Sequence, residues 1–308
     1  MEFKKAVVTG GAGFIGSHIA GELLKDNIET VVIDNLYMGK EEYIPKGARF
    51  IKMDILDRQK LEDAFAGADI VFHQAAHVSI RNSIDNFYND AYTNIMGTVN
   101  VIGAVIKKGI KKLIYASSMG VYGEAESLPI KETQKLEPTS PYGISKLAAE
   151  KYCLQMSNFF GFDAVSLRYF NTFGIRQTLT PYVGVITIFI NRMLKGKPPR
   201  IFGDGKQVRD FVSVSDIAYA NILAMQHGRN GQVMNIASGK GTTVNEVAQV
   251  IIDRLGSGVV PEYTAPKPGE PGSSIADITR AEEFIGYKPR YSLIDKIDAI
   301  INWNKNIS

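Results

Sequence analysis

The sequence has few of the residues that mark disulfide-bonded, metal-binding or membrane proteins. Its 308 residues include one cysteine, Cys153, which cannot form an internal disulfide, so we expect a reducing, cytoplasmic location. The four histidines, at positions 18, 73, 77 and 227, show no ligand-like spacing, and we expect no metal. No run of eighteen apolar residues occurs, and the chain begins MEFKKAVVTGG without an apolar signal region, so we expect no membrane association.

Neither sign of charge is in large excess in the sequence. The 35 basic and 32 acidic residues leave a formal net charge of +3, too small to indicate nucleic acid or a membrane surface as the main partner. Hydrophobic residues make up 45% of the chain and charged residues 22%, which is typical of a soluble globular protein. A chain of this length can form one large α/β unit or two modest domains.

The first half of the chain alternates short apolar runs with amphipathic stretches. This pattern predicts strands at 5–9, 30–33, 48–53, 70–73, 112–117 and 164–168, and helices at 14–25, 58–66, 89–107 and 142–160. Continuous apolar strands alternating with helices are typical of a parallel sheet that is covered on both faces. We therefore predict a doubly wound α/β fold.

After about residue 170 the pattern loosens. It predicts helices at 185–194 and 242–255, loops at 174–184 and 195–211, and a Pro/Gly-rich loop at 261–274. We expect this part to form a smaller α/β lobe over the carboxyl ends of the strands, with 212–228 returning to the first domain. The predicted division is 1–170 plus 212–237 for the sheet domain and 171–211 plus 238–308 for the lobe.

A glycine-rich turn follows the first predicted strand and opens the first predicted helix. The segment TGGAGFIG (9–16) fits G-x-G-x-x-G through Gly11, Gly13 and Gly16, and a longer glycine pattern through Gly10. Glycines let the backbone turn sharply and approach a pyrophosphate, and a helix N-terminus offers it unpaired N–H groups. A structural turn without a cofactor is the alternative, but the flanking strand and helix favour a dinucleotide site.

An acidic residue closes the second predicted strand. Asp34 lies roughly 20 residues beyond the glycine turn, where a ribose-binding acid belongs. A carboxylate there accepts hydrogen bonds from the adenosine 2′-hydroxyl and repels a 2′-phosphate, and no arginine follows immediately to receive such a phosphate. The sequence therefore predicts NAD rather than NADP as the cofactor.

A tyrosine and a lysine lie four residues apart on one face of a predicted helix. The ammonium of Lys146 near the phenol of Tyr142 would lower the tyrosine pKa from about 10 towards neutrality, which makes a general base and acid. A surface tyrosine with a solvated lysine is the alternative, because this spacing is common by chance. The upstream strand ends in Ser117 and Ser118, at the edge where α/β sites form, and this favours the catalytic interpretation.

Together these segments resemble the extended short-chain dehydrogenase/reductase family along nearly the whole chain. The segments are TGGAGFIG (9–16), DNL (34–36), HQAA (73–76), SSMGVYGE (117–124), SPYGISK (140–146), RYFNTFGIRQ (168–177) and GDGKQVRDFV (203–212). The nearest subgroup resembles the UDP-glucose (UDP-galactose) 4-epimerases. The resemblance implies a Rossmann domain with a small substrate lobe, tightly held NAD, a UDP-sugar substrate and a homodimer joined through a four-helix bundle.

The resemblance also implies a role for each matching residue. Tyr142 would be the general base, Lys146 would hold the nicotinamide ribose, and Ser118 would hydrogen-bond the sugar O4. The NAD site would be formed by Gly10, Gly13, Phe14, Ile15, Gly16, Asp34, Asn35, Leu36, Met38, Gly39, Asp54, Ile55, Ala75, Ala76, Asn94, Ser117, Tyr142 and Lys146. The substrate would be held by Ser118, Asn171, Val185, Arg200, Phe202, Arg209, Lys267 and Ser274.

Several of these residues have ordinary structural alternatives. Asn94 is equally typical of a helix-buried amide, Phe202 of a core aromatic, and Arg209 of a surface partner for a neighbouring aspartate. We interpret His73 and His77 as packing residues at a strand end and in a loop, without a role in proton transfer.

The implied reaction is epimerisation at C4 of the sugar. Tyr142 takes the proton of the 4-hydroxyl while C4 passes a hydride to NAD, and the 4-keto sugar turns and takes the hydride back on its other face. Dehydratases and decarboxylases of the family typically carry an acidic residue just past the catalytic serine. Here Met119 and Gly120 follow Ser118, which favours simple epimerisation.

Two further departures from the family pattern concern the substrate. Lys267 stands where an arginine often precedes Pro-Gly-Glu, and lysine lacks the bidentate geometry of arginine. Ser274 stands where hexose-restricted epimerases often hold a bulky tyrosine, which predicts room for an N-acetyl group and activity on UDP-GlcNAc/UDP-GalNAc as well as UDP-Glc/UDP-Gal. The alternatives are a UDP-uronate 4-epimerase, for which Arg176 and Thr178 give no clear carboxylate clamp, another nucleotide-sugar dehydratase or oxidoreductase, and a non-catalytic NAD-binding protein.

Overall fold

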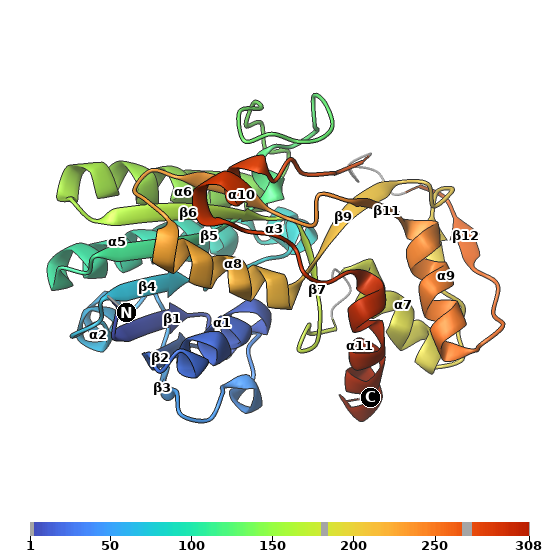
Figure 1. Ribbon diagram of the computed structural model, residues 1–308, viewed down its shortest axis with the longest axis horizontal. Coiled ribbons are helices and arrows are strands. Elements are labelled where there is room, and N and C mark those ends of the chain that lie inside the picture. Colours follow the sequence, from blue (N-terminus) through green and yellow to red (C-terminus); the bar gives the residue numbers. More distant parts are fainter. Residues whose placement is uncertain (1–2, 180–183, 267–272, 308) are drawn as a thin grey trace.

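Seven parallel strands form the central sheet in this computed structural model, which describes residues 3–179, 184–266 and 273–307 (Figure 1). The strands, in the spatial order β10-β6-β5-β4-β1-β2-β3, are β1 (Lys5–Thr9), β2 (Glu29–Asp34), β3 (Arg49–Lys52), β4 (Ile70–His73), β5 (Lys112–Ser118), β6 (Asp163–Tyr169) and β10 (Val233–Ile236). Because β1 pairs with both β2 and β4, the chain winds outwards in two directions from this point. Ligands of such sheets bind beyond the carboxyl ends of the strands at this switch point. The predicted doubly wound Rossmann fold is confirmed.

Helices cover both faces of the central sheet. One face carries α1 (Phe14–Lys25), α8 (Val214–His227) and α10 (Thr279–Ile285), and the other carries α2 (Arg58–Ala64), α5 (Gly97–Lys108) and α6 (Pro141–Phe160). Successive side chains of a strand point to opposite faces, so Val8 packs in the α1/α8 layer and Val7 in the α5/α6 layer. This double burial explains the continuous apolar runs of the sequence. Among the described residues, no helix is both long and apolar enough to cross a membrane.

The long helix predicted at 89–107 is interrupted by a π-helical turn. The predicted segment begins within α4 (Phe87–Ala91), which follows the short helix α3 (Ile80–Asp85), and continues through the π turn η2 (Tyr92–Met96) into α5. Asn94 lies in the π turn and is buried. Such turns are rare inside helices and occur frequently at functional sites.

A smaller α/β lobe follows the central sheet, as predicted. Its strands are β7 (Asn171–Phe173), β9 (Val208–Ser213) and β11 (Gly241–Thr243) in one sheet and β8 (Arg200–Phe202) and β12 (Glu262–Thr264) in another, and its helices are α7 (Val185–Leu194), α9 (Val244–Leu255) and α11 (Leu293–Ile307). The three helices share one core that includes Phe189, Val247 and Ile297. Short 3₁₀ turns occur at η1 (Glu41–Tyr43) and η3 (Met119–Val121).

The chain crosses repeatedly between the sheet domain and the lobe. β6 is separated from β7 by Phe170 alone, and β9 runs directly into α8, which packs on α1. The chain returns to the sheet domain at β10, which is an edge strand of the central sheet, and then enters the lobe at β11. It returns again at α10, which packs on α8, and ends in the lobe helix α11. The boundaries 1–170 plus 212–237 and 171–211 plus 238–308 stay a prediction.

Candidate active site

The glycine turn packs closely against the loop that follows β4. Gly10 has a φ of +68°, and a Cβ added to it would lie 2.6 Å from the backbone nitrogen of Ala75. A Cβ on Gly16 would lie 2.3 Å from the carbonyl oxygen of Gly10, so both positions require glycine. Gly13 caps α1 without a side-chain hydrogen bond, which leaves the first N–H groups of the helix available to an anion.

Asp34, at the end of β2, holds the turn in place. Its Oδ2 accepts a hydrogen bond from the N–H of Ala12 at 3.0 Å, and its Oδ1 accepts one from the N–H of Leu36 at 2.8 Å. Burial raises the pKa of Asp34, and these two backbone donors lower it. The side-chain amide of Asn35 donates to Asp54 Oδ2 at 2.8 Å. The structure thus brings together Asp34, Asn35, Leu36 and Asp54 from the predicted NAD set.

Other residues predicted for NAD lie on α1, in the segment after β2 and at the loop after β4. Phe14 and Ile15 begin α1, Met38 is exposed, and a Cβ on Gly39 would lie 2.9 Å from the carbonyl carbon of Ala12. Asn94 fixes the loop after β4, because its Oδ1 accepts from the N–H of His77 at 2.8 Å and its Nδ2 donates to the carbonyl of His77 at 3.0 Å. In this structure Asn94 is a buried amide whose side chain is hydrogen-bonded to the protein backbone, as in the structural alternative given for it above.

The serine, tyrosine and lysine of the predicted catalytic set meet at the carboxyl end of β5. Ser118 ends β5, and its Oγ and the ring of Tyr142 lie 3.5 and 3.7 Å from the position that a Cβ on Gly120 would take, so the two side chains converge beside Gly120. Tyr142 lies in the first turn of α6, where Ser140 caps the helix and Pro141 occupies the first turn. Lys146 follows one turn later, which places a phenol, a hydroxyl and an ammonium beside the switch point.

The pKa of Tyr142 is set by opposing effects. Burial raises it, the nearby hydroxyl of Ser118 lowers it, and the charge of Asp90 raises it. Burial lowers the pKa of Lys146 to about 8, and its Nζ lies 4.4 Å from the ring centroid of Tyr115. In this structure the pKa of Tyr142 is thus raised, against the lowering expected from Lys146, because burial prevails and the ammonium lies over Tyr115.

His73 is a structural residue, in line with the role expected from sequence. Its Nδ1 lies 2.7 Å from Thr9 Oγ1 and its Nε2 lies 2.9 Å from Thr98 Oγ1. Burial lowers the pKa of His73 to about 3, so the ring is neutral near neutral pH.

A cavity of about 250 Å³ opens between β7 and α7. It contains the predicted substrate residues Asn171 and Val185, together with Thr172, Phe173, Gln177, Gly184, Ile186 and Phe211. Most of the additional members are near neighbours of Asn171 or Val185 in the chain, whereas Phe211 of β9 comes from a distant segment and had no signal in the sequence.

Asn171 connects this cavity with the catalytic strand. Its Nδ2 lies 3.6 Å from the sulfur of Met119, the residue after Ser118, and 3.4 Å from Ser274 Oγ. Ser274 is 1% exposed and is bridged to Arg209 of β9. Ser274 and Arg209 thus lie beside Asn171, as expected for residues of one substrate site.

The other predicted substrate residues lie elsewhere. Arg200 Nε lies 3.2 Å from Glu262 Oε2, in an exposed ion pair between β8 and β12. Phe202 ends β8 and is half-buried. Lys267 lies outside the described residues.

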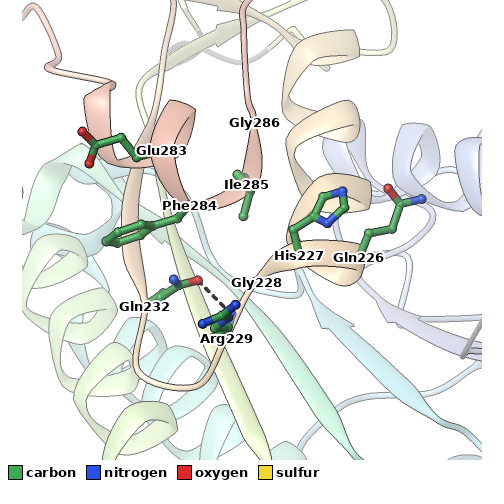
Figure 2. A pocket seen from close by; sticks show the side chains of 9 residues that line it. All are labelled: Gln226, His227, Gly228, Arg229, Gln232, Glu283, Phe284, Ile285 and Gly286. Atoms are coloured by element: carbon green, nitrogen blue, oxygen red, sulfur yellow. Dashed lines mark hydrogen bonds between the residues drawn. The ribbon is translucent and has the colours of Figure 1, made fainter.

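A larger hollow of about 820 Å³ lies at the opposite end of the sheet (Figure 2). Gln232 precedes β10, so this hollow lies by the amino end of that strand, whereas Ser118 lies at the carboxyl end of the parallel strand β5. Its walls include Gln226, Arg229 and Phe284, and it contains none of the predicted site residues.

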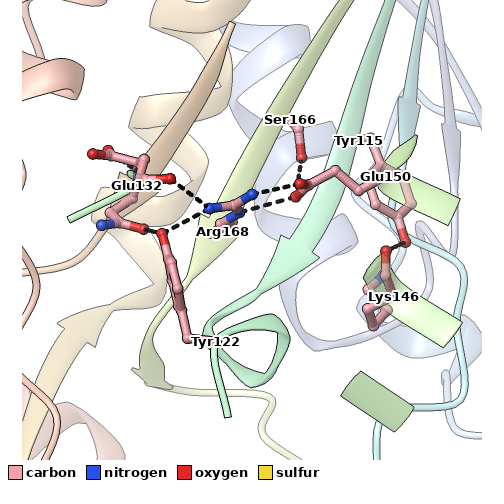
Figure 3. A network of polar contacts seen from close by, with 8 residues as sticks. Tyr115, Tyr122, Glu132, Lys146, Glu150, Ser166 and Arg168 are labelled. Carbon is pink, nitrogen blue, oxygen red and sulfur yellow. Dashed lines mark hydrogen bonds and ion pairs between the residues drawn. The ribbon is translucent and has the colours of Figure 1, made fainter. Parts of the chain in front are cut away.

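A buried polar network anchors α6 to the sheet behind the site (Figure 3). Arg168 of β6 pairs with Glu150 of α6 through Nη2–Oε1 at 2.6 Å and Nε–Oε2 at 3.1 Å. The Arg168 Nη1 also donates to the Tyr122 hydroxyl at 2.9 Å, which donates to Asn235 Oδ1 at 2.6 Å. Glu150 lies two turns beyond Tyr142, so the network fixes the helix that carries the catalytic set.

Comparison with known families decides the classification. The model of the NAD dependent epimerase/dehydratase family matches residues 6–237. The chain belongs to this family. The predicted membership of the extended short-chain dehydrogenase/reductase family, the NAD cofactor and the isomerase class are confirmed.

Relatives of the chain match it over nearly its full length. A putative UDP-glucose 4-epimerase of Methanocaldococcus jannaschii is 41% identical over 97% of this chain and 98% of that protein. Among solved structures, the UDP-glucose 4-epimerase of Thermotoga maritima with UDP-glucose is 38% identical, with a TM-score of 0.95 over 98% of this chain and 99% of that one. A UDP-N-acetylglucosamine 4-epimerase of Methanobrevibacter ruminantium, in complex with UDP-N-acetylmuramic acid, is also 38% identical, with a TM-score of 0.95 over 100% of both chains. The chain is thus an enzyme of the UDP-sugar 4-epimerase type, and these names leave the sugar open.

Proposed function

We propose that this enzyme is an NAD-dependent 4-epimerase that interconverts UDP-glucose and UDP-galactose, and also UDP-GlcNAc and UDP-GalNAc. The observation that carries the proposal is the convergence of Ser118 and Tyr142 beside Gly120 at the carboxyl end of β5, with Lys146 one turn along α6. Met119 and Gly120 follow Ser118, so no carboxylate adjoins it in sequence to serve a dehydration or decarboxylation.

The residues at the glycine turn fit NAD. The uncapped N-terminus of α1 would hold the pyrophosphate, and Asp34 would accept hydrogen bonds from the adenosine ribose. Bound NAD supplies the hydride acceptor and donor for C4. Lys146 would hold the nicotinamide ribose, and its positive charge would favour the Tyr142 phenolate. The roles of the other predicted NAD residues stay predictions.

The catalytic residues move one proton at the sugar O4. Tyr142 would take the proton of the 4-hydroxyl as C4 is oxidised and return it as C4 is reduced. Ser118 would hydrogen-bond O4 beside the phenol and hold it within reach. Because the hydride returns to C4, no net oxidation of the sugar occurs.

The cavity between β7 and α7 has the composition expected of a nucleotide subsite. Phe173 and Phe211 offer apolar surface, and the amides of Asn171 and Gln177 offer donors and acceptors. Arg209, on β9 beside Ser274, would bind the pyrophosphate with its guanidinium fork. The contacts expected from Arg200, Phe202 and Lys267 stay predictions.

Ser274 is the basis for the wider sugar range. Its small side chain lies beside Asn171 and close to Met119. A serine there leaves space beside the sugar that a tyrosine would fill. The uronate alternative lacks such support, because Arg176 and Thr178 give no clear carboxylate clamp.

We also propose that the protein is a homodimer. Exposed apolar side chains follow one another at helical spacing on α4 and η2, at Tyr88, Tyr92 and Met96, and α6 beside them exposes Ile144 and Tyr152. A second copy of this stripe would bury both surfaces in a bundle of four helices. The cytoplasmic location is a further proposal, supported by the single, unpaired thiol of Cys153.

The decisive experiment measures conversion of each UDP-sugar by chromatography with the purified enzyme and with Tyr142→Phe. We expect the enzyme to convert both the hexose and the N-acetylhexosamine pair without release of NADH, and Tyr142→Phe to lose about 100-fold or more of the rate. Equal, negligible turnover by both proteins with every UDP-sugar would contradict the proposal. Activity on the hexose pair alone would contradict only the wider range.

A further inference from the structure

A buried carboxylate lies behind the catalytic tyrosine and lysine. Asp90 on α4 is 2% exposed, and α4 packs against α6, which carries Tyr142 and Lys146. Its Oδ1 accepts a hydrogen bond from Asn94 Nδ2 at 3.1 Å. Its Oδ2 is buried and has no hydrogen-bond partner in the described part of the chain. An ionised carboxylate in this position needs a compensating positive charge, because burial removes its hydration.

Lys146 is the cation that can compensate this charge. It is 3% exposed, and the described residues contain no carboxylate within ion-pair distance of its Nζ, which lies over the ring of Tyr115. Glu150 lies one turn further along α6, but its carboxylate is already neutralised by Arg168. Asp90 and Lys146 are therefore two buried, opposite charges that do not touch and that each lack another counter-ion among the described residues.

A short chain of hydrogen bonds connects Asp90 with the catalytic helix. Asn94 Nδ2, which donates to Asp90 Oδ1, also donates to Ser145 Oγ at 3.0 Å. The hydroxyl of Ser145 in turn donates to the backbone carbonyl of Tyr142 at 3.0 Å. Asn94 lies in the π turn after α4, so this irregular turn presents the amide that joins the two helices.

We propose that Asp90 is a positioning residue: its buried carboxylate supplies the negative charge behind Lys146, and its hydrogen bond with Asn94 holds the first turn of α6. The proposal rests on the proposed epimerase function, because that function gives the charge of Lys146 its importance. Asp90 would act through Lys146 and Tyr142 and touch neither sugar nor cofactor.

The other titratable groups around Lys146 do not replace this charge. They come from β4, β5, the loop after β4 and α6, and they are His73, Tyr115, His77, Glu150 and Cys153. Burial lowers the pKa of both histidines and raises that of Tyr115 and Cys153, which keeps all four neutral near pH 7. Glu150 is paired, which leaves Asp90 as the unpaired charge of this cluster.

One charge thus acts on two pKa values in the same direction. Asp90 raises the pKa of Lys146, which burial alone would lower further, and it also raises the pKa of Tyr142. Without the charge, Lys146 would lose its proton at a lower pH, and the Tyr142 phenolate would form at a lower pH. Both limbs of a bell-shaped pH profile would move towards acid.

The direct test is an NMR titration of the Lys146 ammonium in the NAD-loaded protein, with the matching Lys146→Met protein used to assign its signal. We expect the midpoint in Asp90→Asn to fall by about 1 pH unit, the size of effect of one unit charge at short range in a partly buried site. Asp90→Glu, which keeps the charge, should stay near the parent midpoint. Asp85→Asn removes an exposed carboxylate from the neighbouring helix α3 and should leave the midpoint unchanged.

The titration needs no turnover, so its result is independent of the substrate. An unchanged midpoint in folded Asp90→Asn would overturn the proposal even if the enzyme epimerises UDP-sugars, and a shifted midpoint would support it even without epimerisation. Should Asp90→Asn not fold, Asp90→Ser provides a second neutral side chain for the same measurement. In the active enzyme, the pH profile of kcat/KM should shift towards acid in both limbs, whereas a uniform loss at every pH would indicate a purely structural role.

Discussion

Arg168 and Glu150 form a two-point ion pair that is buried on both sides, with side-chain exposures of 3% and 1%. The pair joins the carboxyl end of β6 to α6, one turn beyond Lys146. It also accounts for the position of Ser166, whose hydroxyl donates to Glu150 Oε2 at 3.0 Å. The ion pair therefore fixes the middle of α6 to the sheet, and the Ser140 cap stabilises the first turn of the helix.

Removal of one partner of this pair should destabilise the enzyme strongly. Arg168→Met leaves the Glu150 carboxylate buried without a counter-ion, and we expect a loss of about 3–5 kcal/mol in the free energy of unfolding. Lys5→Met, at the partly exposed pair with Glu29, should change it by less than about 1 kcal/mol. Urea denaturation measures both, and similar small losses in the two variants would contradict this role.

A bulky residue at position 274 should narrow the sugar range. We expect Ser274→Tyr to retain turnover of UDP-galactose and to lose about 10-fold or more of kcat/KM for UDP-GalNAc, because the ring would occupy the space beside Asn171. The ratio of the two kcat/KM values is the measurement. Equal losses for both sugars would show that Ser274 does not face the C2 substituent, and Ser274→Ala, which keeps the space, should leave the ratio unchanged.

The stability of the enzyme should fall as the pH decreases below about 6.5. The folded state holds His73 with its pKa lowered to about 3, while the unfolded chain binds a proton near pH 6.5, so protons favour unfolding between these values. His73 contributes up to about 1.4 kcal/mol per pH unit in this window. We expect His73→Gln to flatten the decline of Tm between pH 6.5 and 5, and the exposed His227→Gln to leave it unchanged. Parallel declines in all three proteins would contradict the assignment.

A charge in the apolar stripe on α4 and η2 should dissociate the proposed dimer. Tyr88 and Tyr92 stack at 5.9 Å between ring centroids and are both exposed, so Tyr92→Lys would place a charge in the buried part of the interface. We expect a dimer for the parent enzyme and a monomer for Tyr92→Lys by light scattering after gel filtration. Val260→Lys, on an exposed side chain of the lobe, should remain dimeric. A monomeric parent enzyme would contradict the dimer.

The sequence predicted the elements whose signals are local. The bounds of β1, α1, β4 and α7 agree with the prediction, because a glycine turn or a regular apolar period marks them. The sequence does not indicate a helix at α8, because most residues of this helix are buried and its sequence lacks the polar face of an amphipathic helix. The strands β8, β9, β11 and β12 were missed since their pairing partners are distant in the chain.

The same distinction applies to the site. The spacing of Tyr142 and Lys146 is local and predicted one helix face, and the position of Ser118 followed from its place at a strand end. The sequence gives no indication that Asp90 is buried near the site, because an acidic residue in an amphipathic helix is usually expected to be solvent-exposed. The raised pKa of Tyr142 depends on burial and on the field of Asp90, which only the packed structure defines.

The repeated crossing of the chain between its two parts has a consequence for how the enzyme folds. The sheet domain is completed by α8, β10 and α10, which follow in sequence after parts of the lobe, so no single cut in the chain separates two whole domains. A fragment ending after β6 would lack β10 and would leave the apolar face of α1 without α8. We therefore expect the substrate pocket and the dinucleotide fold to unfold as one cooperative body, and a nascent chain to complete the sheet domain only after most of the lobe has been synthesised.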